Sequence, residues 1–544
     1  MYDSASLKLN RTENPHMSKQ AEQKKYEALS PFELKNKLID MSNDNSEKEM
    51  LNAGRGNPNW VALEPRHAYF HLGQFALSES ENNLIQDGFG GVPSQENIET
   101  RFNDFLTDRN GQSGINLLRN CVSYVKDTLS IDPSDFLLEM SDAILGDHYP
   151  VPDRMLSCSE KIVDAYLAKE MGYAQHEGCE FDFFATEGGT AAMAYVFNSL
   201  MENKILKKGD KIAIGTPIFT PYLEIPHLND FEFVELDIEQ DESNEWKYSA
   251  DQIEKLADPS VKAFFIVNPS NPNSFAMHPE SLKALRELIE TRRKDLIVLT
   301  DDVYGTFVNG FQSVASAIPQ NTILVYSYSK FFGATGWRIG VIGLAKDNIL
   351  DDAIQNLQSH QTDELRKRYS RVYLNPDNIK LIDRMVADSR TVALNHTAGL
   401  STPQQVFMVM LSLFSLTDKE GVYKEHAQDI VIKRFNSLYE ALGSPGSSSP
   451  YCAHYYTTID VPMIATQRYG EDFTAWLKSE HEAIDFVWRL AEEKSIVLMD
   501  GGGFDAPEMS VRVSLANLPF EAYGKIGKGV SDLLDQYHTE WKSK

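Results

Sequence analysis

Two serines, a lysine and an arginine gather in the segment SYSKFFGATGWRIG, residues 327–340. Ser327, Ser329, Lys330 and Arg338 place two hydroxyls, an amine and a guanidinium within twelve residues. This set suits a cofactor that carries both an aldehyde and a phosphate, because the amine can condense with the aldehyde while the hydroxyls and guanidinium hold the dianion. The alternative for the segment is a turn with solvated charges.

Two aspartates end the segment DLIVLTDD, residues 295–302, whose apolar run predicts a buried strand. A pyridine nitrogen stays protonated only beside an anion, and protonation makes the ring an electron sink, so a pyridine cofactor needs a buried carboxylate. Asp301 and Asp302 point to opposite sides of a strand end, so only one can face such a ring. A solvated turn is the alternative for the pair.

Two glycines separate a predicted strand from a predicted helix in FDFFATEGGTAAMAYVFNSL, residues 181–200. A helix amino terminus offers unpaired N–H groups and the positive end of the helix dipole, and glycines let the backbone approach an anion closely. Gly188, Gly189 and Thr190 are therefore candidates for phosphate binding, with an ordinary turn as the alternative.

These segments resemble the class I/II aminotransferases, pyridoxal-phosphate enzymes of fold type I. The resemblance rests on S-x-S-K with an arginine eight residues after the lysine, and on N-P-x-N-P within NPSNPNS, residues 268–274. It implies that Lys330 anchors pyridoxal 5'-phosphate and moves protons, and that Arg338 binds the phosphate. The sequence departs from the family at Asn273-Ser274, where Thr-Gly is usual, so the geometry of this turn is in question.

The same resemblance implies roles for further residues. Asp301, three residues before Tyr304, matches the family's partner of the ring nitrogen, and Tyr304 and Asn271 match the residues that bind the phenolic oxygen. Phe219, preferred over Tyr222, matches the aromatic residue on the ring face. The implied cofactor-binding set is Lys330, Gly188, Gly189, Thr190, Phe219, Asn271, Asp301, Tyr304, Ser327, Ser329, Arg338 and Tyr149, of which Lys330, Asp301 and Tyr304 are catalytic.

Three of the implied positions keep alternatives. Tyr149 in DHYPVPDRM matches a tyrosine that crosses the dimer interface to the partner's cofactor phosphate, although a packed core role fits as well. Arg512 matches the arginine that holds the substrate α-carboxylate; an exposed strand arginine is its alternative. Arg55 in GRGNPNW, residues 54–60, lies where the family has a closing amino-terminal arm, or is part of a connector. Arg512, Arg55 and Asn271 form the expected substrate-binding set.

The order of strands and helices predicts an α/β protein, a two-lobed fold type I subunit with a large, mostly parallel α/β sheet domain and a smaller α+β domain. We expect a mobile tail over 1–28, an arm over 29–60, the cofactor-binding domain with insertions over 61–429 and the small domain over 430–544. Residues 61–145 suggest no chemistry. Residues 346–390 predict a charged, solvated helical insertion, with subunit contact as the alternative.

Composition narrows the class of protein. The chain has 544 residues, a formal charge of −27 and 42% hydrophobic residues, as in a globular protein without a basic face for nucleic acid or anionic membranes. Its four cysteines lie far apart with no CxxC, so we expect neither a disulfide framework nor a metal site. No signal peptide or membrane span is apparent, which predicts a cytoplasmic protein.

Within the family, the length, the GRGNPNW arm, the NPSNPNS variant and the insertion most resemble the L-aspartate β-decarboxylases. This resemblance implies conversion of L-aspartate to L-alanine and CO2, with side transamination of aspartate to a 2-oxo acid. A plain aminotransferase for aspartate or another amino acid is one alternative. A non-catalytic ligand sensor is another, but it would need a basic DNA-binding module that the acidic chain lacks. A homodimer with shared active sites, or a higher homo-oligomer, is implied.

The substrate β-carboxylate is expected to lack an arginine clamp. Aspartate aminotransferases take an arginine for it from the region before the segment that corresponds to STPQQ. Here TVALNHTAGL, residues 391–400, contains only His396, with Arg390 just outside. Neutral donors or a single loosely placed charge, best supplied by Arg55, are therefore expected.

Overall fold

The computed structural model describes residues 21, 23–26, 29–44, 49–174, 179–219, 221–222, 234–392, 394 and 399–544. The chain forms two compact units. The smaller unit comprises residues 1–55, 434–446 and 457–544, and the larger comprises 56–433 and 447–456. The expected domain boundaries near 60 and 429 stay predictions.

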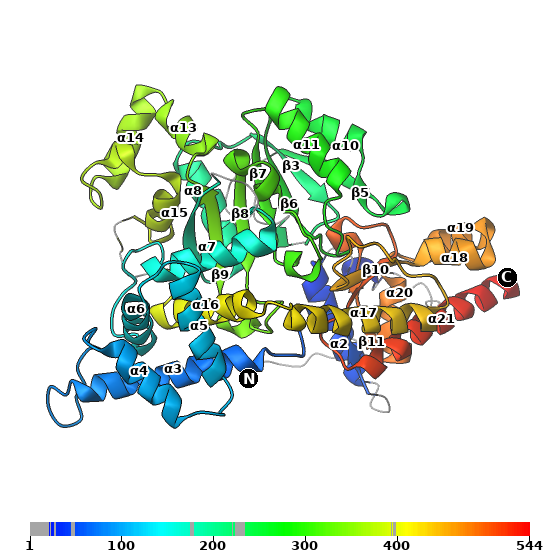
Figure 1. Cartoon of the computed structure of the whole chain (residues 1–544). Coiled ribbons are helices and arrows are strands. Elements are labelled where there is room, and N and C mark those ends of the chain that lie inside the picture. The colour runs from blue at the N-terminus through cyan, green and yellow to red at the C-terminus, as the bar shows by residue number, and fades with distance from the viewer. Residues whose placement is uncertain are drawn as a thin grey trace, which may run out of the picture. The chain divides into compact units, whose positions relative to one another are not determined.

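A sheet forms the centre of the larger unit (Figure 1). It has eight strands in the order β2-β9-β8-β7-β6-β3-β4-β5. The neighbours from β8 through β4 pair in parallel, and β5 and β9 pair antiparallel with their neighbours. Strands β2, β7, β8 and β9 are buried along their whole length, which is why they read as nearly continuous apolar runs. The expected α/β fold with a mostly parallel sheet is confirmed. The strands are β2 Phe181–Thr186, β3 Lys211–Thr216, β4 Val234–Asp241, β5 Lys247–Tyr248, β6 Val261–Val267, β7 Ile297–Asp301, β8 Thr322–Ser327 and β9 Gly340–Ala345.

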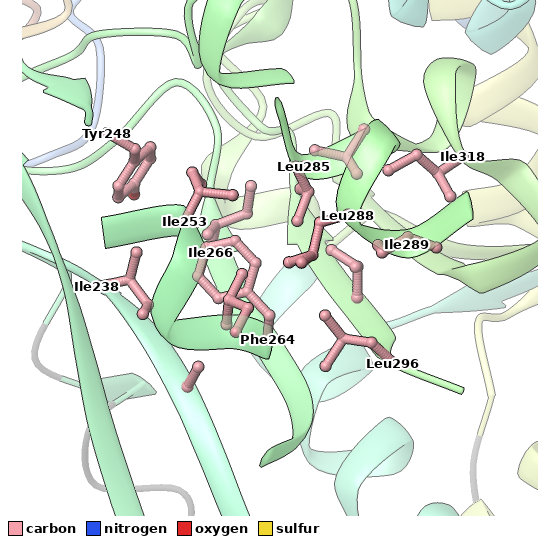
Figure 2. Close-up of a cluster of buried hydrophobic side chains, with 14 of the residues drawn as sticks. Ile238, Tyr248, Ile253, Phe264, Ile266, Leu285, Leu288, Ile289, Leu296 and Ile318 are labelled. Atoms are coloured by element: carbon pink, nitrogen blue, oxygen red, sulfur yellow. The ribbon is translucent and has the colours of Figure 1, made fainter. Parts of the chain in front are cut away.

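One hydrophobic cluster fixes helix α11 (Pro279–Thr291) to this sheet (Figure 2). Phe264 and Ile266 of β6 meet Leu285, Leu288 and Ile289 of α11 within it, all nearly inaccessible to solvent. Burying side chains of this size contributes about 1.5–3 kcal/mol each. The packing therefore holds rigid the strands whose carboxyl ends carry the candidate residues.

Helices supply the rest of the larger unit. Residues 61–145 form α3, α4, α5 and α6, and α16 is almost wholly buried and contacts α3, α5, α6 and α7. Ser401 caps α16 by accepting a hydrogen bond from the Gln404 N–H. The helices are α3 Leu63–Asn82, α4 Ile98–Asp108, α5 Ile115–Asp127, α6 Pro133–Leu145, α7 Ser157–Met171, α8 Gly189–Glu202, α10 Ala250–Glu254, α12 Val314–Ala317, α16 Thr402–Thr417 and most of α17 Val422–Leu442.

The insertion differs from expectation. It forms α13 (Ile349–Gln355), α14 (Ser359–Tyr369) and α15 (Leu381–Ser389), and α15 packs against α8 with most of its side chains buried. The solvated insertion was the wrong expectation for α15, because a buried carboxylate ties it to α8. Asp388 accepts hydrogen bonds from Ser199 at 2.6 Å, Asn203 at 3.1 Å, Tyr369 at 2.9 Å and Arg368 at 3.0 Å.

The smaller unit mixes helices with short strands. Strand β1 (Leu51–Asn52) pairs in parallel with β11 (Ile496–Val497), and β10 (Tyr456–Asp460), β13 (Ser510–Ser514) and β12 (Met499–Asp500) form a second sheet. Its helices are α2 Pro31–Asp44, α18 Val461–Tyr469, α19 Glu471–Glu480, α20 Asp485–Lys494 and α21 Phe520–Ser543. No helix among the described residues is long and apolar enough to span a bilayer.

Most of the tail expected to be mobile lies outside the described residues. Residues 21 and 23–26 are helical, and Gln23 is buried, where its amide donates to Asp485 at 2.6 Å.

Candidate functional site

The carboxyl ends of adjacent strands bring the candidates of the larger unit to one edge of the sheet. Asp301 is the last residue of β7, Lys330 follows β8, and Asn271 follows β6. Because these three strands run in parallel, their ends meet at the same edge, where open α/β sheets bind ligands. Gly188 follows β2 and is the N-cap residue of α8.

Asp301 is the buried carboxylate of this edge. Its Oδ2 accepts a hydrogen bond from the Tyr222 hydroxyl, and its Oδ1 accepts one from the Val303 N–H at 3.2 Å. Burial raises the pKa of Asp301 to about 6. A carboxylate in this state gains from a cationic neighbour such as a protonated ring nitrogen.

Asp302 occupies a different environment. Its Oδ1 accepts from the Thr300 hydroxyl, and burial raises its pKa to about 8. The two neighbouring aspartates therefore have separate partners, as expected of adjacent residues at a strand end.

Glycines, hydroxyls and a guanidinium form an anion cradle around the start of α8. Gly188 has φ +98°, and a Cβ there would collide with the Arg338 guanidinium. A Cβ at Gly189 would lie 3.6 Å from Cβ of Ser327. The Ser327 hydroxyl donates to the Ser329 hydroxyl at 2.9 Å. Together with Thr190, exposed in the first turn of α8, these groups match the donors that a phosphate dianion needs.

Lys330 lies against the glycine loop of the predicted arm. Its Nζ donates to the Gly56 carbonyl at 3.1 Å, and the Tyr455 hydroxyl donates to the same oxygen at 2.9 Å. A Cβ at Gly56 would lie 3.4 Å from Nζ and would collide with the Tyr456 hydroxyl. The backbone therefore approaches its neighbours closely at Gly56, which only glycine allows.

Aromatic side chains complete this region. Tyr304 is buried, and its hydroxyl donates to that of Tyr456 at 3.3 Å. Phe219 is half-buried and meets Tyr222 edge to face, with ring centroids 5.7 Å apart. Tyr222, Tyr455 and Tyr456 were not predicted as site residues. Tyr222 was considered, but Phe219 was preferred to it. The sequence around Tyr455 and Tyr456 indicated a strand and gave no sign of a role in the site.

Tyr149 is 59% exposed, so the alternative of a packed core role is wrong. It borders a cavity of about 480 Å³ together with Glu187 and Arg390. The neighbouring residues 391–400, which contain no arginine for the β-carboxylate, are described only in part. His396 lies outside the described residues.

Arg512 is a deeply buried cation of the smaller unit. It lies in β13 with 1% exposure, so the alternative of an exposed strand arginine is wrong. Its Nη2 donates to the Gly54 carbonyl at 2.9 Å, and its guanidinium stacks over Phe504. Desolvation lowers the pKa of Lys35, and the positive charges of Arg512 and Arg55 add to this effect. These three cations thus form an electropositive cluster that favours carboxylates.

Comparisons with known proteins cover most of the chain. The family model for aminotransferase class I and II matches residues 184–525. The chain is 48% identical, over 95% of its length and 97% of the relative, to a Pseudomonas protein named bifunctional aspartate aminotransferase and L-aspartate beta-decarboxylase. It is 26% identical to an aspartate aminotransferase of Geobacillus stearothermophilus, over 63% of the chain and 75% of the relative.

Solved structures agree on the fold. A Pyrococcus protein named A1 matches with a TM-score of 0.59 and 17% identity, covering 95% of this chain and 99% of its own. An aspartate aminotransferase from Thermus thermophilus, solved with maleate, matches with a TM-score of 0.55 and 16% identity, covering 96% and 100%. At these identities the likeness establishes the fold alone.

Proposed function

Because the chain belongs to the class I and II aminotransferases, we propose that it converts L-aspartate to L-alanine and CO2 and also transaminates aspartate with a 2-oxo acid. The 48% identity along nearly the whole length of the bifunctional Pseudomonas relative carries this proposal. Enzymes of the family use pyridoxal 5'-phosphate, which is the cofactor of this chain.

The larger unit fits this cofactor. The glycines before α8 leave room that a Cβ would fill, and hydroxyls and a guanidinium surround it, which suits a phosphate. When bound, the cofactor supplies an electron sink whose strength depends on a protonated ring nitrogen. In our proposal Lys330 holds the aldehyde carbon, Asp301 the ring nitrogen, Tyr304 and Asn271 the phenolic oxygen, Phe219 the ring face, and Gly188, Gly189, Thr190, Ser327, Ser329 and Arg338 the phosphate.

Lys330 is also the proton carrier of the proposal. When its amine is free, Lys330 could take the Cα proton of the substrate and return it elsewhere. The Gly56 carbonyl, 3.1 Å from Nζ, is an acceptor that orients this amine.

Substrate binding is assigned to Arg512, Arg55 and Asn271. A planar guanidinium pairs with a planar carboxylate through two hydrogen bonds, which suits Arg512 for the α-carboxylate. The β-carboxylate leaves as neutral CO2, so a tight arginine clamp on it would stabilise the ground state more than the transition state. We therefore assign to it only a loosely placed charge, Arg55.

A homodimer with shared sites completes the proposal. The exposed Tyr149 would reach the cofactor phosphate of the partner subunit, and a higher homo-oligomer remains compatible with this arrangement. The acidic composition and the expected absence of a nucleic-acid or membrane partner favour a cytoplasmic enzyme of small molecules.

Product analysis tests the function. The cofactor-loaded protein is given L-aspartate with and without a 2-oxo acid, and CO2, alanine and oxaloacetate are measured. Equal amounts of CO2 and alanine without added 2-oxo acid are expected, and Lys330→Ala should abolish both. Oxaloacetate as the sole product would support the plain aminotransferase, a reading favoured by relatives such as that of Geobacillus stearothermophilus. Binding without turnover would support the sensor.

A further inference from the structure

A serine occupies a backbone conformation that favours glycine. Ser274, the last residue of NPSNPNS, has φ +66° and is fully buried. Left-handed backbone is costly for a residue with a Cβ, and such residues persist where the surroundings require them. The family resemblance places a glycine at this position, so the hydroxyl is what the chain gains from the serine.

The Ser274 hydroxyl and carbonyl both hold the segment 453–456. The hydroxyl accepts the Tyr456 N–H at 2.8 Å, and the carbonyl accepts the Ala453 N–H at 2.8 Å. Phe275 adds an isolated antiparallel bridge to Cys452. A glycine could supply the carbonyl bond, but it could not supply the hydroxyl bond to Tyr456.

The segment held by Ser274 presents its tyrosines to the cofactor site. The Tyr456 hydroxyl accepts from Tyr304 at 3.3 Å, and the two rings meet edge to face with centroids 5.5 Å apart. The Tyr456 hydroxyl also occupies the space that a Cβ at Gly56 would need. The Tyr455 hydroxyl donates to the Gly56 carbonyl, which also accepts a hydrogen bond from the Lys330 amine. Ser274 is thus connected to Tyr304 through one residue, Tyr456.

We propose that Ser274 and Tyr456 are positioning residues that orient the Tyr304 phenol toward the cofactor. The inference rests on the proposed role of Tyr304 as donor to the cofactor's phenolic oxygen. A phenol has one proton to donate, so when Tyr304 gives it to the cofactor, its oxygen can accept the hydroxyl proton of Tyr456. That bond polarises the Tyr304 O–H and strengthens its donation, because linked hydrogen bonds reinforce one another.

A stronger bond to the phenolic oxygen makes the cofactor-lysine chromophore more acidic. The readout is therefore the pH midpoint of the visible absorbance change of the cofactor-loaded protein without substrate. Tyr456→Phe should raise this midpoint by roughly half a pH unit. A neutral hydrogen bond can produce a shift of this size when it acts on the cofactor through another residue, here Tyr304. Ser274→Gly should raise it less. Glycine relieves the backbone strain at φ +66° but leaves the buried Tyr456 N–H without its acceptor, so urea unfolding serves to verify that the variant is folded.

Two further variants separate the possible failures. Tyr304→Phe measures the full effect of the phenol on the chromophore. Tyr166→Phe is the matched control, because it removes one hydroxyl of another buried tyrosine pair, 2.8 Å from that of Tyr326, and should leave the midpoint unchanged. If Tyr304→Phe does not move the midpoint, the proposed role of Tyr304 fails. If Tyr304→Phe moves it but Tyr456→Phe and Ser274→Gly do not, the positioning inference alone is overturned.

Discussion

Asp301 and Asp302 show at the scale of single residues how position decides chemistry. Burial raises the pKa of both carboxyls, yet Asp301 is hydrogen-bonded to Tyr222 at the ligand edge, whereas Asp302 is bonded to Thr300. Keeping the buried Asp301 ionised costs free energy in the cofactor-free protein, and the positive charge of Lys330 offsets only part of that cost. The same carboxylate becomes favourable when a protonated ring nitrogen faces it.

This cost predicts a pH dependence of stability for the cofactor-free protein. The folded pKa of Asp301 is about 6, above the ordinary value of 3.8, so the folded state binds more protons between these values and loses stability as pH rises through this window. Asp301→Asn removes the titration. The free energy of unfolding of the variant, relative to that of the native protein, should rise by up to about 3 kcal/mol between pH 4 and pH 7.5 in urea unfolding. Parallel pH profiles would contradict the assignment.

Adding the cofactor provides the control for this prediction. A protonated ring nitrogen that faces Asp301 should stabilise its carboxylate. The cofactor-loaded native protein should therefore have a higher free energy of unfolding than the cofactor-loaded Asp301→Asn variant. Equal gains on loading in both proteins would show that Asp301 does not meet the ring.

At the scale of elements, the glycine before α8 decides how closely the helix can approach an anion. Gly188 has φ 98° and ψ 171°, and Gly470, which precedes α19, has nearly the same backbone, φ 92° and ψ 169°. A Cβ at Gly188 meets Arg338, whereas one at Gly470 meets nothing within 4 Å. The chain therefore contains its own matched control.

Gly188→Ala and Gly470→Ala should both lower stability by about 1–3 kcal/mol through backbone strain. Only Gly188→Ala should weaken cofactor binding, by about tenfold or more, because its methyl group displaces the Arg338 guanidinium from the cradle. Titrating the cofactor-free variants with pyridoxal phosphate measures this difference. Equal affinities for the two variants would exclude the start of α8 from the phosphate site.

Elements also show which features could be predicted from sequence. The strands that end at Asp301 and Ser327 were predictable because doubly buried parallel strands read as apolar runs followed by polar residues. The burial of α15 was not, because the hydrogen bonds that tie Asp388 to α8 come from Ser199 and Asn203, far away in sequence. Tyr455 was not predicted as a site residue for the same reason, since its partner Gly56 lies 399 positions upstream. Local patterns carry no signal for such pairings.

At the scale of the whole molecule, the exposure of Tyr149 bears on assembly. A large aromatic side chain that is 59% exposed beside a predicted active-site segment fits a contact to another subunit. If Tyr149 serves the partner's phosphate site, a Tyr149→Ala subunit and a Lys330→Ala subunit each lack a different part of the same composite site.

Mixing these two inactive variants should restore activity, because a hybrid dimer regenerates one intact site. A statistical mixture of exchanged dimers contains about half hybrids, so up to about a quarter of native activity is expected. Subunit exchange is verified with differently tagged chains. Exchange without recovery would place Tyr149 in the site of its own subunit or outside the active site.

The last prediction concerns the arm, where the chain passes from the smaller unit to the larger between Arg55 and Gly56. The Gly56 carbonyl accepts a hydrogen bond from Lys330, so the exposed Arg55 is one residue from the backbone group that contacts the proposed catalytic amine. Water that reaches the bound substrate before CO2 leaves diverts it to oxaloacetate, so the quality of this cover should set the ratio of products. Arg55→Ala should therefore raise oxaloacetate relative to alanine, as measured by product analysis with aspartate alone. The control is Arg286, an exposed arginine on α11. Arg286→Ala should leave the ratio of oxaloacetate to alanine unchanged. An unchanged ratio in Arg55→Ala, or an aspartate complex with a bidentate arginine on the β-carboxylate, would contradict the loosely held leaving group.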